Sequence, residues 1–359
     1  MESTVATGDA IAVEQFNDMA FREYVSKLVL KPYMGTSPES VVHVDEDTAK
    51  DVGDAITFNL VGALSGEGVE DDSTMEGNEE EMNMYGHRLE LKELKNAIRL
   101  GGPMSRRRTK FDQKMHAKSA LTTWLAQKIE DKAFEAFGSI DGVAYAAASE
   151  GNKDAWLANN ADRVLFGAAV SNNSANDHSA SLLNIDGTAD ILLVEQITLA
   201  KRRAQLGDPK IRPIRIENGE EYFVMFVHPY CARDLKNSDA WKQAQREAMP
   251  RGGSNPIFTG MIGMYDGVIV KESEKVLLLD GVGAGGIDVA ANVLCGAQAL
   301  VLGHGGYEDG SKVELVEEKF DYGKKPGFQI STIYGIEKPI FQNSKQHGVV
   351  TVYSAAVAD

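Results

Sequence analysis

Cysteine is almost absent from the sequence, because Cys231 and Cys295 are the only two thiols among 359 residues. Two cysteines provide neither a disulfide framework nor a zinc cluster, so we expect a chain that folds in a reducing compartment. The seven histidines follow neither the HExxH nor the HxH spacing, and no GxSxG motif is present. The sequence therefore predicts no metal site, no cofactor site and no catalytic residues.

Two further absences limit the partners that we expect. No segment approaches the run of about 18 apolar residues that a membrane-spanning helix requires, and the N-terminus lacks the basic and apolar regions of a signal peptide. Basic residues are in deficit, with 37 Lys and Arg against 53 Asp and Glu, for a net charge of −16. We therefore expect a soluble intracellular protein without general affinity for nucleic acid or membranes.

Glycine, in contrast, is abundant at 35 residues, which indicates many turns and strand ends. Gly281, Gly283 and Gly286 form a GxGxxG motif directly after the apolar stretch VLLLD. In dinucleotide-binding proteins such a motif lets a pyrophosphate approach a helix N-terminus. Here no regular alternation of strands and helices surrounds it, so we expect a surface loop. A nucleotide-binding enzyme that uses residues 281–286 is kept as an alternative.

Residues 105–137 contain neither Pro nor Gly, whereas Pro103 precedes them and Gly138 follows them. This punctuation predicts one helix about 50 Å long. Thr109 and Asp112 offer a weaker start of the capping type. Most of the apolar residues are three or four positions apart, which predicts a stripe that packs on a sheet.

Just upstream, residues 55–64 and 88–100 alternate between apolar and polar positions, as strands do. The intervening residues 67–86 are acidic, contain no Lys or Arg, and lack the ligand spacing of a calcium loop. The pattern predicts a long hairpin with an acidic tip. A two-stranded ribbon is marginally stable alone, so this hairpin needs a partner surface.

Opposite charges at the hairpin tip and at the start of the long helix suggest where that partner surface lies. We expect the two groups to meet between copies of the chain, where complementary charges fix register and orientation. The alternative is that both groups are simply solvated. The candidate intersubunit residues are Glu79, Glu80, Glu81, Arg106, Arg107 and Arg108.

The remainder of the chain mixes helices with strands, which predicts an α+β fold. Helices are expected at 190–206 and at 229–248. Strands are expected at 210–216 and 221–227, joined by an Asn-Gly turn, and again at several places from residue 312 onward. A helix is also expected at residues 11–30, after a polar tail.

This order of elements resembles the HK97-type major capsid protein of tailed bacteriophages. Local sequence resembles the N4-type branch of that family, in EYFVMFVHPYCARDLKNSDAWKQAQ at 221–245 and NPIFTGMIGMYDGVIVKES at 255–273. GDAITFNLVGALSG at 53–66 and RLELKELKNAIRLGG at 88–102 resemble it too. The similarity extends over nearly the whole chain, and its motifs are structural.

The resemblance implies a division of the chain into an N-terminal arm, an extended E-loop hairpin, a peripheral (P) domain and an axial (A) domain. In the family, E-loops lie over neighbouring subunits and A domains surround the centres of hexamers and pentamers. The glycine-rich loops at 250–256 and 281–286 are candidates for A-domain edges near those axes. The implied ranges are 1–50 for the arm, 51–103 for the E-loop, 104–187 and 311–359 for the P domain with its spine helix at 105–137, and 188–310 for the A domain.

The function implied by the resemblance is self-assembly into the icosahedral phage head that encloses double-stranded DNA, without enzymatic activity. Implied partners are other copies of the chain, scaffold, portal and decoration proteins, and packaged DNA bound without sequence specificity. Assembly would occur in the bacterial cytoplasm, and the product would be the virion shell. The hairpin tip has Asn78 and Asn83 but no Lys, so we expect no isopeptide crosslink there. An encapsulin-like cargo shell is the alternative with the same fold.

Overall fold

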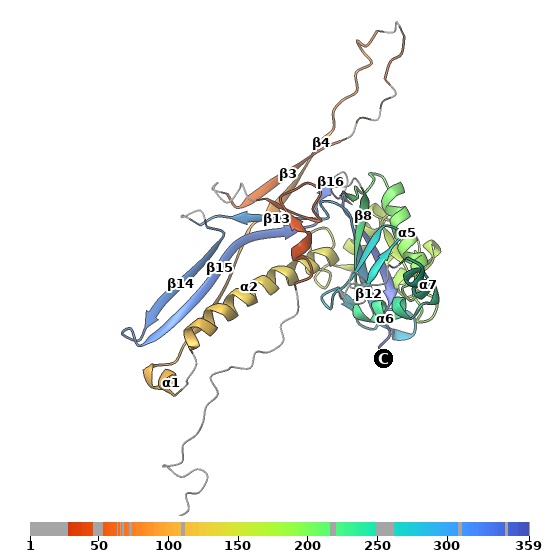
Figure 1. The fold of residues 1–359 in the computed structure, drawn as a ribbon. Coiled ribbons are helices and arrows are strands. Elements are labelled where there is room, and N and C mark those ends of the chain that lie inside the picture. Colours follow the sequence, from red (N-terminus) through yellow and green to blue (C-terminus); the bar gives the residue numbers. More distant parts are fainter. Residues whose placement is uncertain are drawn as a thin grey trace, which may run out of the picture.

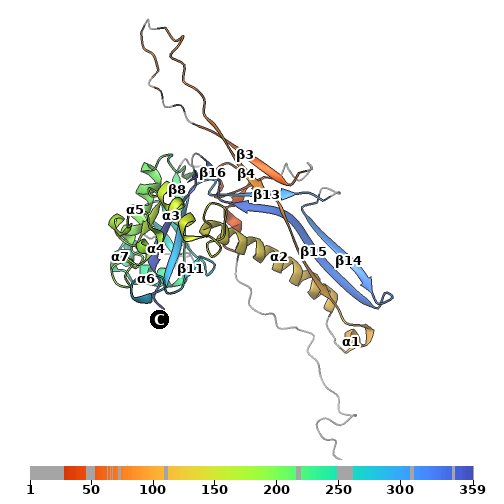
Figure 2. The same cartoon turned by 180° about the vertical axis from the view of Figure 1, so that it is seen from behind.

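The computed structural model describes residues 28–358, apart from short gaps at 46–52, 63, 65, 67, 72–73, 109–111, 216–219, 249–261, 308–310 and 342–343. The helix predicted at 11–30 and most of the predicted arm therefore lie outside the described residues. Figures 1 and 2 show a compact lobe of helices and strands joined to an elongated lobe, from which a hairpin projects. Among the described residues, no helix combines the length and the apolar character needed to cross a membrane.

The compact lobe is built on an eight-stranded sheet. Its strands are β6 (Val164–Phe166), β7 (Ile214–Arg215), β8 (Glu221–Val227), β9 (Gly263–Tyr265), β10 (Val268–Glu272), β11 (Leu278–Leu279), β12 (Val289–Cys295) and β18 (Val349–Ala355). They lie in the order β6-β18-β12-β8-β10-β9, with β11 beside β12 and β7 beside β8. β12 runs antiparallel to β8 and β18, whereas β10 runs parallel to β8.

Helices surround this sheet in Figure 1. They are α3 (Glu150–Asn159), α4 (His178–Leu182), α5 (Val194–Leu206), α6 (Pro229–Asn237) and α7 (Asp239–Ala248). β8 is apolar on both faces: Met225 and Val227 pack in one core cluster with residues of α5 and α6, whereas Val224 and Phe226 pack in another. A strand that is covered on both sides reads as a continuous apolar run, as YFVMFV does here.

The elongated lobe contains a six-stranded sheet. Its strands are β1 (Met34–Gly35), β2 (Val42–Asp45), β5 (Lys92–Arg99), β13 (Leu300–Gly305), β14 (Val313–Phe320) and β15 (Lys325–Glu337). β15 is central, because it pairs antiparallel with β5, β13 and β14. The helix α2 (Gln113–Gly138) lies along this sheet, where Leu121 and Leu125 pack with Phe328 and Ile330 of β15.

The single helix predicted at 105–137 is wrong at its N-terminal end. The short helix α1 (Pro103–Arg107) ends before the gap, and α2 begins after Asp112. The Asp112 carboxylate accepts hydrogen bonds from the backbone N–H groups of Lys114 at 2.9 Å and Met115 at 3.4 Å. These are N–H groups that a helix leaves unsatisfied at its start, so the capping residue, rather than Pro103, sets where α2 begins.

Three other expectations about elements need correction. The strands of the implied P-domain range 311–359 do not all lie in the sheet on α2: β14 and β15 do, but β18 pairs with β12 and β6 in the compact lobe. The helix predicted at 229–248 is two helices, with Ser238 in extended conformation between them. The strand predicted at 88–100 is divided after Glu90, and only its first part belongs to the hairpin.

A buried lysine fastens the C-terminal end of α2. The Lys338 ammonium donates to the carbonyl oxygens of Phe137 at 3.1 Å and Ser139 at 2.6 Å, and it lies 5.7 Å from the centre of the Trp156 ring. A helix leaves its last carbonyls unsatisfied, and its C-terminus favours a cation. Burial lowers the pKa of Lys338 from its ordinary value to about 7.

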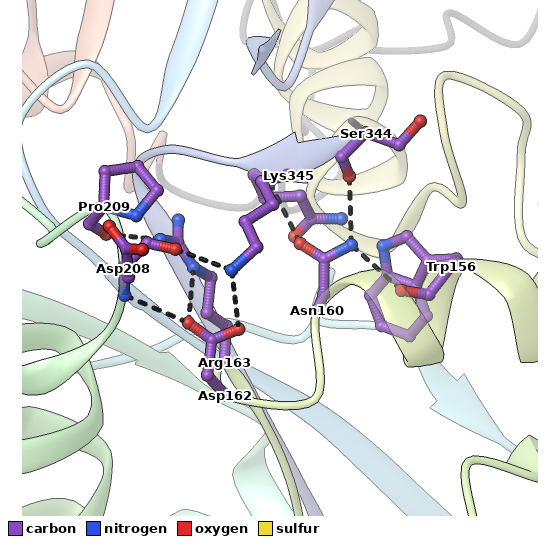
Figure 3. A network of polar contacts seen from close by, with 9 residues as sticks. Trp156, Asn160, Asp162, Arg163, Asp208, Pro209, Ser344 and Lys345 are labelled. Atoms are coloured by element: carbon purple, nitrogen blue, oxygen red, sulfur yellow. Dashed lines mark hydrogen bonds and ion pairs between the residues drawn. The ribbon is translucent and has the colours of Figure 1, made fainter. Parts of the chain in front are cut away.

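A second group of polar contacts fastens the short hairpin of β16 (Ile340–Phe341) and β17 (Lys345–Gln346), as Figure 3 shows. Asn160, which follows α3, donates to the carbonyl of Ser344 at 3.1 Å and accepts from the Gln346 N–H at 3.0 Å. Lys345 donates to the carbonyl of Asp208 at 2.7 Å. The hairpin is thereby tied both to α3 and to the segment that follows α5.

We expect Asp112→Ala to lower the free energy of unfolding by about 1 kcal/mol, because two N–H groups at the start of α2 lose their acceptor. Asp112→Asn is the matched control, since its side-chain oxygen can still accept these bonds and its stability should stay close to that of the wild type. Denaturant unfolding of the unassembled subunit measures both. Equal stability of the Ala variant and the wild type would show that Asp112 does not cap α2.

The pKa of Lys338 predicts a pH dependence of stability. Between about pH 7 and its ordinary value, the unfolded chain binds a proton at this lysine and the folded chain does not. Stability should therefore rise with pH, by about 2 kcal/mol from pH 7 to pH 9 relative to Lys338→Met, which has no such group. Lys95→Met, at an exposed position, is the control. Parallel stability curves for the wild type and Lys338→Met would contradict the prediction.

Candidate intersubunit surfaces

The predicted hairpin is present and projects from the elongated lobe (Figure 1). β3 (Ala55–Val61) pairs antiparallel with β4 (Met84–Glu90) in a two-stranded sheet of its own. At its base, Ile56 and Leu89 are buried. They lie so close to Gly303 and Gly335 that an added Cβ would come within 2.3 Å of Ile56 and 2.9 Å of Leu89. The two glycines thus let the base of the hairpin rest directly on β13 and β15.

The three candidate glutamates lie at the exposed tip of this hairpin. Glu79 accepts the N–H of Gly77 at 2.7 Å, and Glu80 accepts the N–H of Gly66 across the hairpin, also at 2.7 Å. Glu81 is exposed. Two of the three carboxylates therefore shape the tip, and all three residues are exposed.

Methionines accompany the charges at both ends. Met75, Met82 and Met84 of the hairpin are more than half exposed, as are Met104 in α1 and Met115 in α2. Methionine is a flexible and polarizable side chain that adapts to varied surfaces. Each charged end therefore also offers apolar area for contact with another chain.

The three candidate arginines lie at the far end of the elongated lobe. Arg106 in α1 donates to the carbonyl of Lys324 at 3.2 Å, so α1 rests against the turn between β14 and β15. Arg107 and Arg108 are exposed. In Figures 1 and 2 the hairpin tip and α1 lie at opposite ends of the subunit. The structure therefore does not bring the two predicted charge groups together within one chain.

The edge of the elongated sheet at β14 is a further exposed surface that the sequence analysis did not identify. β14 pairs with β15 on one side and with no other described strand on its other side. Val313, Leu315 and Val316 are 44%, 46% and 39% exposed, and Tyr322 at the turn is fully exposed. An edge strand with exposed apolar side chains is a surface on which another chain can pack. The alternation after residue 312 was visible in the sequence, but its position at an edge depends on pairing.

The GxGxxG motif does not have the geometry that a dinucleotide requires. Gly281, Gly283 and Gly286 lie between β11 and β12, which are antiparallel neighbours. Residues 284–286 form a single 3-10 turn, and the next element is the strand β12. Because no helix N-terminus follows the loop, the motif lacks the group that would face a phosphate. The surface loop expected from the sequence is the observed structure.

One group of carboxylates in the described residues could hold a cation. Glu150, Asp154 and Asp177 place their oxygen atoms within 4.8 Å of one another. Each is also engaged by the fold: Asp177 accepts the N–H of Ala180 at the start of α4, and Asp154 accepts the N–H of His178, both at 2.8 Å. Glu150 is paired with Lys153. Their separation in sequence explains why spacing alone did not suggest this cluster.

The chain is similar to phage capsid proteins along nearly its whole length. The family described as phage capsid protein matches residues 4–358. The major capsid protein of Pseudomonas phage KPP25 is 27% identical, over 94% of this chain and 93% of that protein.

Solved phage capsids share the fold. The cyanophage Pam1 capsid chain is 28% identical with a TM-score of 0.87, and the match covers 99% of both chains. The Ralstonia phage GP4 capsid chain is 25% identical with a TM-score of 0.79, and the match covers 100% of this chain and 99% of that chain. The α+β, HK97-like fold predicted from the sequence is confirmed. The chain therefore belongs to the phage capsid protein family, and it is a major capsid protein of a phage head.

Proposed function

We propose that this capsid protein builds its shell from hexamers and pentamers of itself, and that its role is structural rather than catalytic. The similarity to capsid chains over the full length of the described fold supports the proposal best. Many modest interfaces repeated around a closed shell give high total stability, even when each contact is weak.

We propose that the two lobes divide this work. The compact lobe would serve as the A domain around the centres of hexamers and pentamers, and the elongated lobe would serve as the P domain that carries the E-loop. Strand pairing favours a division different from the expected ranges, because β6 and β18 share a sheet with β8 and β12. β13 in turn belongs with β15.

We further propose that the glutamates at residues 79–81 of one subunit contact the arginines at residues 106–108 of a neighbour. The two groups have opposite charge and lie at opposite ends of one chain, so a contact between them would join two copies (Figures 1 and 2). Complementary charge would set the register of the contact, and the exposed methionines at both ends would add apolar area.

The remaining partners follow from the role of a phage shell. We propose that a separate scaffold protein and a portal take part in assembly in the host cytoplasm. Decoration proteins can then bind the outside of the shell. Packaged DNA would lie inside the shell without sequence-specific contacts. The net charge of −16 suits such a shell, because it disfavours tight binding to the phosphate backbone.

Sedimentation of the purified chain, followed by negative-stain electron microscopy of the fast fraction, tests the assembly. Closed shells or six- and fivefold rings would support it, and particle diameter would separate a phage head from a small cargo compartment. A slow monomer or dimer, both alone and with its scaffold protein, would contradict self-assembly.

Replacing Glu79, Glu80 and Glu81 by Gln should impair assembly while the isolated subunit stays folded. Exposed ion pairs contribute about 0.2–1 kcal/mol each, so three lost pairs weaken each contact by roughly 0.6–3 kcal/mol. The yield of closed particles and their resistance to denaturant measure the effect, which should shrink at high salt because the same pairs are screened.

The control is Glu195→Gln with Asp239→Asn and Glu274→Gln, which makes the same change in net charge at exposed positions of the compact lobe. A variant with Arg at residues 79–81 alone, or with Glu at residues 106–108 alone, should lose closed particles. The variant that combines both changes should form them again, because the charges are again opposite. Normal particles of unchanged stability from the triple Gln variant would exclude this charge contact.

A further inference from the structure

The first described residues of the chain are held firmly between the two lobes. Leu30 is fully buried, in one core cluster with Phe134 of α2 and Phe226 of β8. Tyr33 lies edge-on to Phe226, with ring centres 5.8 Å apart. A 3-10 helix at Lys31–Tyr33 connects the two contacts. Residues 28–33 are therefore fixed to the core of the subunit.

A buried carboxylate on α2 binds the backbone at this point. Glu130 is only 3% exposed, and its Oε1 accepts hydrogen bonds from the N–H groups of Leu30, at 2.9 Å, and Val29. Both residues lie outside the described helices and strands, and Glu130 supplies an acceptor for each of their amides. Hydrogen bonds to an ionised acceptor are about twice as strong as neutral ones.

The same carboxylate is paired with a cation from the compact lobe. Lys275, in the loop between β10 and β11, places its Nζ 3.0 Å from Glu130 Oε2 and 2.8 Å from Asp131 Oδ1. It also donates to the carbonyl of Gln127 at 3.4 Å. Although burial opposes it, the hydrogen bonds that Lys275 donates to Asp131 and Glu130 raise the pKa of Lys275 above its ordinary value. The lysine stays charged and holds α2 against the compact lobe.

Burying these charged groups has a large desolvation cost, so core stability alone does not explain them. A buried ion pair is often no more stable than well-packed apolar residues of the same size, although removing one partner destabilises strongly. Unlike an apolar side chain, Glu130 binds specific atoms: it holds the backbone amides of Val29 and Leu30 at one turn of α2. We infer that Glu130 is a positioning residue that fixes residues 29 and 30, where the N-terminal segment joins the core, and that shell assembly depends on this fixed junction.

Hydrogen–deuterium exchange of the unassembled full-length subunit tests the first part. Peptides covering residues 28–33 report on the two amides. We expect exchange at least tenfold faster in Glu130→Ala than in the wild type, and an intermediate rate in Glu130→Gln, whose amide oxygen can still accept. Lys275→Met should keep the slow exchange, because the carboxylate that binds the amides remains. Wild-type exchange rates in Glu130→Ala would overturn the inference.

The second part is tested by the yield of closed particles from Glu130→Gln, the variant with the least change in shape. We expect a severalfold loss of particles from a subunit whose thermal unfolding remains cooperative. Glu135→Gln is the matched control on the same helix, since Glu135 is paired with Lys132 at an exposed position, and it should assemble normally. Normal particle yield from Glu130→Gln and Glu130→Ala, despite fast exchange, would overturn the role in assembly.

This second readout rests on the proposed self-assembly, and the two failures are distinguishable. If the wild type itself forms no particles, the proposed function fails. If the wild type assembles and exchange is unchanged in the variants, only the role of Glu130 fails.

Discussion

The structure depends on the burial of α2 against two different partners along its length. Its N-terminal half packs Leu121 and Leu125 on β15 of the elongated lobe. Its C-terminal half packs Phe134 and Phe137 against Phe226 of β8, with ring centres 5.7 and 5.9 Å apart. Because one rigid helix serves both cores, the direction of the elongated lobe relative to the compact lobe is set by the sequence of a single element.

Ionisable groups at this junction act on backbone atoms rather than on other side chains alone. Lys338 binds carbonyls at the end of α2, and Glu130 binds amides of the entering chain. Burying such groups is costly unless their hydrogen bonds are made, and these bonds exist only when the segments are correctly placed. The apolar core thus supplies most of the attraction, and the polar groups select one arrangement of the segments that meet there.

The sequence predicted those features that depend on local pattern. The hairpin followed from alternation, and the existence of α2 followed from its apolar spacing. Its start at Asp112 was available only as the weaker choice, because Pro103 and the glycines before it are equally good punctuation for α1. The pairing of strands that are far apart in the sequence could not be predicted. The run VVTVYSA at 349–355 is buried at every position, and nothing in its residues distinguishes β12 from β15 as a neighbour. The role of Glu130 could not be predicted either, because a glutamate in a basic helix is expected to be exposed to solvent.

The subunit exposes surfaces that a protein functioning as a monomer would bury. A two-stranded hairpin gains little stability alone, and β14 exposes apolar side chains along an edge. Had the acidic tip and the arginines been placed side by side, one copy would have satisfied both. Their location at opposite ends makes the proposed contact heterologous, joining unlike patches of successive copies. Heterologous contacts form rings when their rotation closes and open filaments when it does not. The fixed angle that α2 imposes between the lobes is therefore the property that would decide between a shell and a fibre.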